Sequence, residues 1–403
     1  MPARRARVLA PSDLARLRAG TRVEVGGRVL LAEPGRLTLS DAFTNVQATG
    51  EGLEAAPGDL VVVAGRAERG RVGGARLLER RELPSPRGDG EVARFIWNET
   101  GKRLAARARA LAAIRGYFAR EGFLEVETPV RVPAPGVDAH VDAFRAEGGF
   151  LVTSPELSMK RLLVGGLPRI FQLARVLRRD EQGSLHEPEF TLLEWYRAFS
   201  GFEAVLADTE ALVREVARAV SGRAELHTPD GRRLSLRAPF HRVSVRDAFR
   251  RFARVRDAAE LAEQDEARYF ELLVERVEPA LARLDRPVFL LDYPVSQAAL
   301  ARPSPADPSV AERFELYAGG VELSNGYGEL VDPVEQARRF AAERARRKAE
   351  GRRVYPLDRR FLAALREGMP AAGGNALGLD RLILLATGAK SVGDVMAFPA
   401  EFG

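Results

Sequence analysis

The stretch from Leu177 to Tyr196 reads LRRDEQGSLHEPEFTLLEWY and says more about the fold than any other part of the chain. Arg178 and Asp180 precede a polar loop and Glu194 follows on the returning side, so the segment has the length and pattern of a β-hairpin. Such a hairpin presents a guanidinium to a phosphate from one strand and a carboxylate to an amine from the other. Activation of an amino acid with ATP requires this pairing. The stretch therefore predicts an enzyme that makes an aminoacyl adenylate.

The segment resembles motif 2 of class II aminoacyl-tRNA synthetases in their lysine branch, where the pattern reads F-R-N-E, a loop, and H-N-P-E-F-T-x-x-E-x-Y. The spacing matches residue for residue. Three positions differ, since Leu177 replaces Phe, Arg179-Asp180 replaces Asn-Glu, and Glu187 replaces Asn. The resemblance implies that the following motif 2 residues bind ATP: Arg178, Arg179, Asp180, His186, Glu187 and Phe190.

The composition is that of a two-domain globular protein without thiol chemistry. The chain has 403 residues, of which 46% are hydrophobic, and it contains no cysteine, which excludes disulfides and thiolate metal sites. No apolar run is long enough to span a membrane, and the basic N-terminus lacks the apolar core of a signal peptide. We expect a cytoplasmic protein. The net charge is +6, and almost all of the basic residues are arginines. We interpret these arginines as a solvated surface rather than a groove for a polyanion.

An all-β segment precedes the motifs. Short alternating or β-branched runs at residues 23–31, 36–39, 46–49, 60–63 and 75–83 are separated by Gly, Pro and Asp turns. They resemble a shortened form of the OB-fold with which lysyl-tRNA synthetases hold the anticodon. OB-folds bind single strands by stacking bases on aromatic rings, and Phe43 is the only ring before Phe95. We therefore expect tRNA binding to be lost or the barrel to be repurposed.

Two further segments resemble the remaining class II motifs. Residues 101–120 have the apolar spacing of an amphipathic helix, whose apolar face consists of Leu104, Ala108, Leu111, Ile114 and Phe118. Residues 122–129 continue as a strand that ends at Pro129, as in the dimer-forming motif 1. Residues 373–381 read GGNALGLDR and resemble motif 3, which implies that Gly378 lies against the adenosine and Arg381 binds the triphosphate. Together the motifs predict an α+β fold, with a class II synthetase-like antiparallel sheet flanked by helices at residues 91–403 and a small OB-like β-barrel with its linker at residues 1–90.

Residues 314–330, FELYAGGVELSNGYGEL, lie between motifs 2 and 3. Strand alternation places Asn325, Tyr327 and Glu329 on one face, where they can surround a cationic side chain. The resemblance implies that Glu315 and Glu322 hold magnesium on the ATP phosphates, and that Glu322 and Leu323 belong to the ATP site. ATP and Mg²⁺ are therefore the expected cofactors, and Arg178 and Arg381 the expected catalytic residues.

Glutamates in and near these motifs predict a diamino acid as the substrate. We assign Glu194 to the side-chain ammonium and Glu156 with Glu329 to the second amino group, because only a substrate with two ammonium groups needs anions at both ends. Lysine or a lysine isomer follows. The complete set of expected substrate-binding residues is Ser154, Pro155, Glu156, Glu194, Tyr196, Asn325, Tyr327, Glu329 and Ala376.

Ser154 and Ala376 stand where lysyl-tRNA synthetases usually carry Ala and Gly. With residues 293–301, YPVSQAALA, they make residues 95–400 similar to the elongation factor P β-lysine ligases, paralogues of those synthetases. This resemblance implies (R)-β-lysine as substrate, elongation factor P as acceptor, and a homodimer through the region near Pro129. His186 is assigned to the γ-phosphate, and no general base is identified. A compact lysyl-tRNA synthetase and a non-catalytic regulatory paralogue remain as alternatives.

Overall fold

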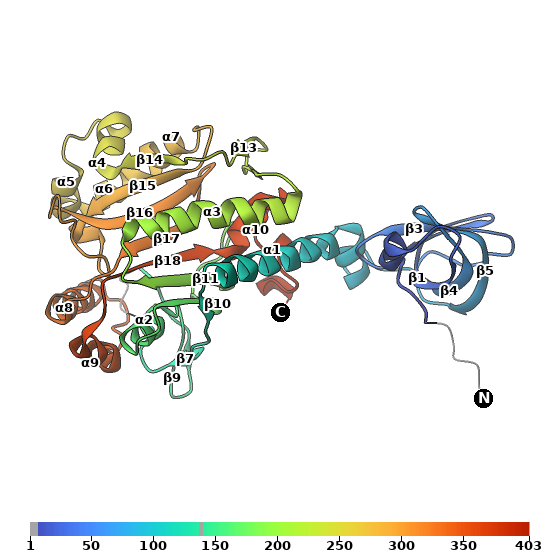
Figure 1. The fold of residues 1–403 in the computed structure, drawn as a ribbon, viewed down its shortest axis with the longest axis horizontal. Helices are drawn as coiled ribbons and strands as arrows, with labels where there is room; N and C mark the ends of the chain where they lie inside the picture. The colour runs from blue at the N-terminus through green and yellow to red at the C-terminus, as the bar shows by residue number, and fades with distance from the viewer. Residues whose placement is uncertain (1–6, 137–139, 403) are drawn as a thin grey trace. The chain divides into compact units, whose positions relative to one another are not determined.

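The computed structural model describes residues 7–136 and 140–402 (Figure 1). Contacts divide the chain into residues 1–105 and 106–403. The first unit is a closed five-stranded barrel with the strand order β1-β2-β3-β5-β4. Its strands are β1 (Arg22–Glu33), β2 (Arg36–Ser40), β3 (Asn45–Thr49), β4 (Leu60–Glu68) and β5 (Arg71–Arg81). The predicted division at residues 90 and 91 stays a prediction.

The barrel closes around the β-branched and leucine residues that alternate along its strands. Val25, Leu37, Leu39, Val63 and Val72 are completely buried in its interior. Because successive strand residues point to opposite faces, the alternation in the sequence becomes an apolar interior and a polar exterior. Phe43, the one aromatic residue of the strands and their turns, is 52% exposed. The predicted small β-barrel is confirmed.

The second unit is built on an eight-stranded sheet in the order β14-β15-β16-β17-β18-β11-β10-β6. The strands are β6 (Leu124–Glu125), β10 (Arg169–Leu177), β11 (Glu189–Ala198), β14 (His241–Ser244), β15 (Val288–Pro294), β16 (Val310–Ala318), β17 (Val321–Gly328) and β18 (Ala372–Gly378). All neighbours from β15 to β10 are antiparallel, while the two edge strands β14 and β6 pair in parallel. The predicted α+β class with its antiparallel sheet is confirmed.

Helices cover the sheet, and smaller strands lie outside it (Figure 1). The helices are α1 (Thr100–Arg120), α2 (Glu156–Val164), α3 (Phe202–Ser221), α4 (Val245–Ala248), α5 (Ala258–Gln264), α6 (Glu266–Leu272), α7 (Glu278–Leu281), α8 (Pro333–Ala349), α9 (Arg359–Gly368) and α10 (Leu379–Thr387). The smaller strands are β7 (Arg131–Val132), β8 (Arg145–Ala146), β9 (Gly149–Leu151), β12 (Glu225–His227) and β13 (Arg233–Ser235). None of the helices in the described ranges is long and apolar enough to cross a membrane.

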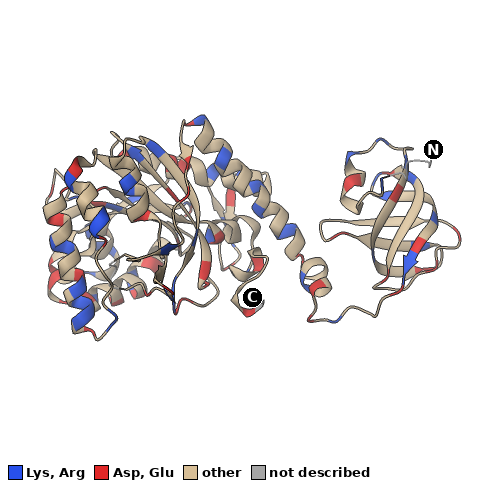
Figure 2. Cartoon of the chain, turned by 90° about the horizontal axis from the view of Figure 1, so that it is seen from below, with Lys and Arg blue, Asp and Glu red and all other residues tan. Residues whose placement is uncertain are grey.

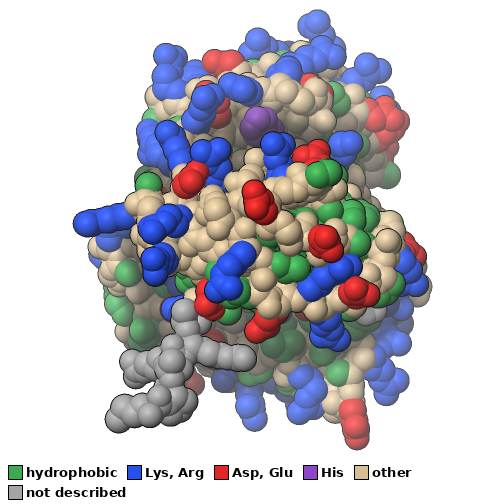
Figure 3. All heavy atoms as spheres, turned by 90° about the vertical axis from the view of Figure 1, so that its right-hand side faces the viewer, with side chains coloured by type: hydrophobic (Ala, Val, Ile, Leu, Met, Phe, Trp, Pro, Cys, Tyr) green, Lys and Arg blue, Asp and Glu red, His purple; other side chains and the backbone are tan. Residues whose placement is uncertain are grey.

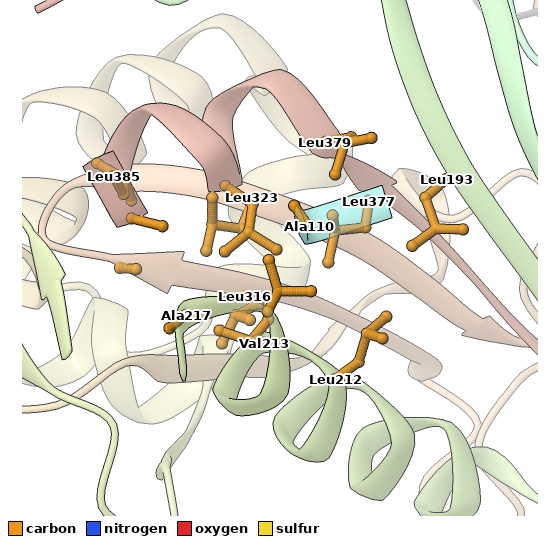
Figure 4. Packing of buried hydrophobic residues seen from close by; sticks show 14 of the residues in the cluster. Ala110, Leu193, Leu212, Val213, Ala217, Leu316, Leu323, Leu377, Leu379 and Leu385 are labelled. Carbon is orange, nitrogen blue, oxygen red and sulfur yellow. The ribbon is translucent and has the colours of Figure 1, made fainter. Parts of the chain in front are cut away.

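The two faces of the sheet have different neighbours. One face packs against α1, α3 and α10 in a single apolar layer, part of which Figure 4 shows between Leu212 and Val213 of α3 and Leu377 of β18. The other face meets α2, α8 and α9 through Ile170 and Tyr196. Along β11 the side chains therefore alternate, with Leu193 and Trp195 in the helical layer and Glu194 and Tyr196 on the opposite side.

Helix α1 begins and ends close to the predicted residues, and Gly122 follows it with a φ of +73°. Its buried face runs through Ala106, Ala110 and Ile114, whereas Ala108, which the apolar spacing had placed inside, is exposed. The helix is rotated because Arg107 points inward and binds Asp380 of α10 and the Thr191 hydroxyl of β11. A polar contact thus decides which face is buried.

Charged side chains of both signs are mixed over the surface. Figure 2 shows basic and acidic positions mixed over most elements, whereas α1 carries basic positions only. Figure 3 shows basic side chains dispersed among acidic and uncharged ones on the face that it draws. Many of them form exposed ion pairs one helical turn apart, such as Arg268–Glu271. Such pairs contribute little to stability, because water screens them.

One buried ion pair joins three elements of the second unit. Arg197 of β11 donates two hydrogen bonds to Asp208 of α3, at 2.6 and 2.7 Å, and lies 4.7 Å over the ring of Phe123. The hydroxyl of Tyr117 in α1 donates to the same carboxylate at 2.9 Å. Arg197 and Asp208 keep only 11% and 6% of their side-chain surface exposed. Removal of either charge would leave the other buried without its partner.

We predict that Asp208→Ala lowers the free energy of unfolding of the second unit by about 3 to 5 kcal/mol, because it leaves the buried Arg197 guanidinium with the half-exposed Glu121 as its remaining ion-pair partner. Chemical denaturation followed by circular dichroism measures this change. The matched control is Glu271→Ala, which removes the acid of an exposed pair and should cost less than about 1 kcal/mol. Equal effects of the two substitutions would contradict the importance of the buried pair.

Candidate active site

A cavity of about 520 Å³ opens on the face of the sheet opposite α1, α3 and α10. Strand pairing places one row of partners across four strands of this face, from Glu194 of β11 to Ala376 of β18, Asn325 of β17 and Glu315 of β16. All four line the cavity. The other predicted site residues in its lining are Ser154, Glu156, Arg178, His186, Glu187, Phe190, Glu322, Leu323, Tyr327, Gly378 and Arg381. The cavity thus brings motif 2, motif 3 and residues 314–330 together.

Glu194 is completely buried and has neutral partners only. Its carboxylate accepts hydrogen bonds from the hydroxyl of Ser154 at 2.6 Å and from the hydroxyl of Tyr196 at 2.8 Å. Burial, and next the nearby charge of Glu156, raise the pKa of Glu194 to about 8, although the two hydroxyl donors oppose the shift. Tyr196 does not line the cavity and acts on it by holding Glu194. A carboxylate so placed stabilises a cation that enters the cavity.

Glu156 and Glu329 share one partner, the ammonium of Lys160. Lys160 lies one turn after Glu156 in α2, and its Nζ atom is 2.5 Å from a carboxylate oxygen of each acid. Lys160 and Glu329 are both 0% exposed. Burial alone would lower the pKa of Lys160, but the two carboxylates outweigh it and raise the pKa, so the side chain is an ammonium.

Glu329 keeps its predicted face but does not line the cavity. β17 ends at Gly328, yet the backbone of Glu329 still donates to the carbonyl oxygen of Ala372 in β18, so strand alternation carries from Asn325 and Tyr327 to Glu329. Its carboxylate faces Lys160 and packs against Gly374, where a Cβ atom would lie 2.4 Å from a Glu329 oxygen. The prediction of a direct contact between Glu329 and the substrate is therefore replaced by a contact with Lys160.

Arg178 follows β10 at the beginning of the motif 2 loop, several residues along the strands from Glu194. Its Nε atom donates to the carbonyl oxygen of Thr153 at 3.3 Å, and its guanidinium lies 5.2 Å over the ring of Phe190 and 3.6 Å from Glu181. These contacts leave 27% of the side chain exposed. A guanidinium held in this way is preorganised for a phosphate or a carboxylate.

Arg381 connects the three segments that build the cavity. It donates to the carbonyl oxygens of Leu185 in the motif 2 loop and Glu322 in β17, at 3.1 and 2.9 Å, and to the Nε2 atom of His186 at 2.6 Å. Burial and then the charge of Arg381 lower the pKa of His186, so His186 is neutral and its Nε2 atom is an acceptor. Gly378 is the last residue of β18 and the N-cap residue of α10. Because it has no Cβ atom, the space beside the aliphatic part of the Arg381 side chain is open.

Arg179 and Asp180 face away from the cavity, against the prediction that both bind ATP. Asp180 has a φ of +66° and a side chain that is 73% exposed and paired with Arg179. The backbone of Arg179 donates to the carbonyl oxygen of Asp142. Because the left-handed residue turns the chain, the acid that reaches the cavity is the next one, Glu181. The spacing of motif 2 placed the acid one residue too early.

Glu315 and Glu322 provide the oxygen donors beside the phosphate end. Glu315 accepts hydrogen bonds from the hydroxyls of Tyr293 and Tyr317, at 2.5 and 2.7 Å, and from Arg313 at 2.5 Å. The Glu322 side chain is 40% exposed, and limited solvation and the charge of Glu315 raise its pKa to about 7. Such an anion is stabilised by a cation, and carboxylate oxygens suit Mg²⁺. Within residues 7–136 and 140–402, no three acidic or histidine side chains gather in a metal-binding cluster.

The other predicted residues have supporting contacts. Glu187 lines the cavity, but one of its oxygens accepts a hydrogen bond from the backbone of Ala400, which attaches the C-terminal segment to motif 2. Pro155 lies outside the lining and is the N-cap residue of α2, directly before Glu156. Leu323 is buried in the apolar layer and contributes to the cavity wall.

Sequence reasoning missed three charged residues of the site. Lys160 pairs with the two acids, Glu181 replaces Asp180, and Arg313 holds both Asn325 and Glu315 while its guanidinium lies 4.3 Å over the ring of Tyr293. The spacing of Glu156 and Lys160, four residues apart in a helix, was a usable signal. Arg313 and Glu315, two residues apart in a strand and therefore on one face, were another.

Comparisons with known proteins identify the family and several relatives of the chain. Residues 91–401 match the family model of the class II tRNA synthetases (D, K and N). The chain is 40% identical to an elongation factor P–(R)-β-lysine ligase of Vibrio cholerae, over 74% of this chain and 95% of the relative. It is 40% identical to the protein of the same name from Proteus mirabilis, over 77% and 98%. It is 38% identical to a lysine–tRNA ligase of Azoarcus sp., over 75% of this chain and 64% of that relative.

These relatives are named ligases, as the sequence predicted, and they include the β-lysine ligases that its motifs resemble. The chain spans less than two thirds of the length of the lysine–tRNA ligases that it matches. The family model covers motif 2, motif 3 and residues 314–330, which all border one cavity. The protein therefore belongs to the family of class II tRNA synthetases (D, K and N).

Proposed function

We propose that the protein is an ATP-dependent ligase that activates (R)-β-lysine or lysine as an aminoacyl adenylate and transfers it to a lysine ε-amine of elongation factor P. The observation that carries the proposal is the position of Glu194. Its buried carboxylate has only the hydroxyls of Ser154 and Tyr196 as partners, in a cavity that also contains Arg178 and Arg381. A substrate with an ammonium at one end and a carboxylate at the other fits this polarity.

The first step joins the substrate to the α-phosphate. A substrate carboxylate oxygen attacks the α-phosphorus of ATP, the bond from this phosphorus to the bridging oxygen breaks, and pyrophosphate leaves. Arg178 orients the carboxylate and the α-phosphate, while Arg381 stabilises negative charge on the leaving phosphates. Both side chains are held by backbone carbonyl oxygens, so they need little rearrangement when ATP binds.

Magnesium fits the phosphate end of the cavity. Glu322 would hold the ion with its partly exposed carboxylate, and Glu315, on the neighbouring strand, would support it. When bound, the ion neutralises phosphate charge and favours departure of pyrophosphate. Glu315 is fixed by Arg313, Tyr293 and Tyr317. Its position beside Glu322 is therefore set before any ion enters.

In the second step the neutral ε-amine of the acceptor attacks the carbonyl carbon of the adenylate. An amide bond forms, the bond from the carbonyl carbon to the phosphate oxygen breaks, AMP leaves and the amine loses a proton. His186 is poorly placed to take this proton, because its Nε2 atom accepts from Arg381. We assign His186 to the phosphates and propose no protein residue as the base.

Two observations favour a protein acceptor over tRNA. The match covers 95% of one named elongation factor P ligase and 98% of another but only 74% and 77% of this chain, so these two relatives contain little outside the region that they share with it. The barrel offers a single exposed ring, Phe43, for stacking of bases.

Two residues beside Glu194 favour β-lysine over lysine. Ser154 donates a hydrogen bond to Glu194, and Ala376 pairs with it across the strands. These contacts suit an amino group on the β carbon rather than on the α carbon.

A compact lysyl-tRNA synthetase is the second candidate, because a closed five-stranded barrel precedes the synthetase-like unit, as an anticodon-binding domain would. We further propose a homodimer through the region near Pro129. Leu124 of edge strand β6 and Val130 are 53% and 46% exposed, and a second copy would cover both.

We predict that Glu194→Gln weakens lysine binding by about 100-fold or more while ATP binding changes little, because an amide leaves the substrate ammonium without a counter-charge in a buried site. Calorimetric titrations with each ligand measure the effect, and ATP–pyrophosphate exchange reports activation. Arg178→Ala is the matched variant at the other end, and it should reduce exchange with only a modest loss of lysine affinity. Equal effects of both variants on both ligands would contradict the assigned roles.

We also predict that lysine affinity increases with pH between about pH 6 and about pH 8, by up to tenfold per unit. The sign follows because the ligand binds the ionised form of Glu194, whose pKa is about 8 in the empty cavity, so protons compete with the ammonium at lower pH. Titrations in two buffers of different ionisation enthalpy should show proton release. In Glu194→Gln this release should shrink; an unchanged pH profile in that variant would contradict the account.

A further inference from the structure

The amino-acid end of the cavity contains a cation of its own. Lys160 is fully buried in α2 and lies 2.5 Å from Glu156 on its own helix and 2.5 Å from Glu329 at the end of β17. Glu194 is close enough to be influenced by the Lys160 charge but forms no ion pair with it. Lysine is rarely buried in this way without a reason, since desolvation of an ammonium is costly.

The ionisable groups at the amino-acid end of the cavity have a definite net charge when all of them are ionised. Three buried or nearly buried carboxylates, those of Glu156, Glu194 and Glu329, surround one ammonium, so the fully ionised cluster carries three minus one, or two, negative charges. Ser154 and Tyr196 add neutral hydroxyls. Arg302 also acts on Glu329 from a distance, but it is paired with Glu312 at 2.7 Å. The remaining two charges equal those of the two ammonium groups of a diamino acid.

We propose that Lys160 is the positioning residue that sets this charge, by neutralising one of three carboxylates so that the cavity matches a substrate with two ammonium groups. The inference rests on the proposed function and deepens it. Glu156 lines the cavity and meets one amino group, Glu194 meets the other, and Glu329 acts through Lys160 from behind the wall. Lys160 also fixes the carboxylate of Glu156, which would otherwise be drawn toward any cation in the cavity.

The test is a double-mutant cycle on lysine or β-lysine affinity, measured by calorimetry. Glu329→Gln leaves two carboxylates and the Lys160 ammonium, a net of one negative charge, and should weaken binding of the diamino acid by roughly 30-fold or more. Lys160→Met combined with Glu329→Gln restores a net of two negative charges, because methionine is neutral and has a side chain of similar length to lysine. The double variant should bind about tenfold or more tightly than Glu329→Gln alone.

A purely structural role of Lys160 predicts the opposite result, because a second substitution in the same buried cluster would then weaken binding further. A double variant that binds no better than Glu329→Gln overturns the inference. Titration with ATP reports on folding, since Arg178 and Arg381 do not contact Lys160. If wild-type protein binds neither lysine isomer, the proposed function fails first, and this result is distinguishable from normal wild-type binding without rescue.

The single variant Lys160→Met provides an independent measurement if Glu329→Gln does not fold. Without the ammonium, the cluster has three carboxylates close together, and one of them takes up a proton in the empty cavity. Charge matching requires that one of the three carboxylates keep a proton in the complex, so lysine affinity in Lys160→Met should increase with pH less steeply than in the wild type. An identical slope in the two proteins would also overturn the inference.

Discussion

The register of four antiparallel strands is the constraint on which the site depends. It places Glu194, Ala376, Asn325 and Glu315 side by side across β11, β18, β17 and β16. A slip of one residue in any strand would move its member of the row to the apolar layer under α1, α3 and α10. That layer resists such a slip, because Leu193, Trp195 and Leu377 are completely buried in it. The packing of one face therefore holds the polar groups of the other in place.

The strand direction, which crosses this row, separates two kinds of chemistry. At one end lie the buried carboxylates and Lys160, which suit ammonium groups. At the other end Arg178 and Arg381 suit phosphates, beside the carboxylate of Glu322. Asp380 joins the two halves of the scaffold, because its carboxylate accepts from the backbone of Thr191 at 2.7 Å and binds Arg107 of α1. The elements that carry motifs 1, 2 and 3 are thus connected through one buried acid.

Much of the fold was predictable because its signals are local. Elements of the structure correspond to the alternation in residues 23–83, to the amphipathic helix at residues 101–120 and to the spacing of the three motifs. The site was predictable where strand alternation holds, as for Asn325 and Tyr327. It was not where the backbone departs from a regular strand. The left-handed Asp180, for example, exchanges roles with Glu181. Glu329 keeps the predicted face, but its pairing with Lys160 of another element is not visible in the sequence.

Pairings between distant residues were beyond the sequence as well. Lys160 and Glu329 meet only after α2 packs against β11 and α9, and Arg107 reaches Asp380 only after α1 packs on the sheet. No local pattern marks such contacts. They decide charge balance and helix orientation nonetheless, which is why Ala108 is exposed and Glu329 is paired with Lys160.

The most direct test of the account is the mass of elongation factor P after incubation with the full-length protein, ATP, magnesium and β-lysine. The account predicts the addition of one lysyl group to elongation factor P, no charging of lysine tRNA, and retention of this activity after deletion of residues 1–88. Unmodified elongation factor P, together with tRNA charging that the same deletion abolishes, would contradict it and identify a compact lysyl-tRNA synthetase instead.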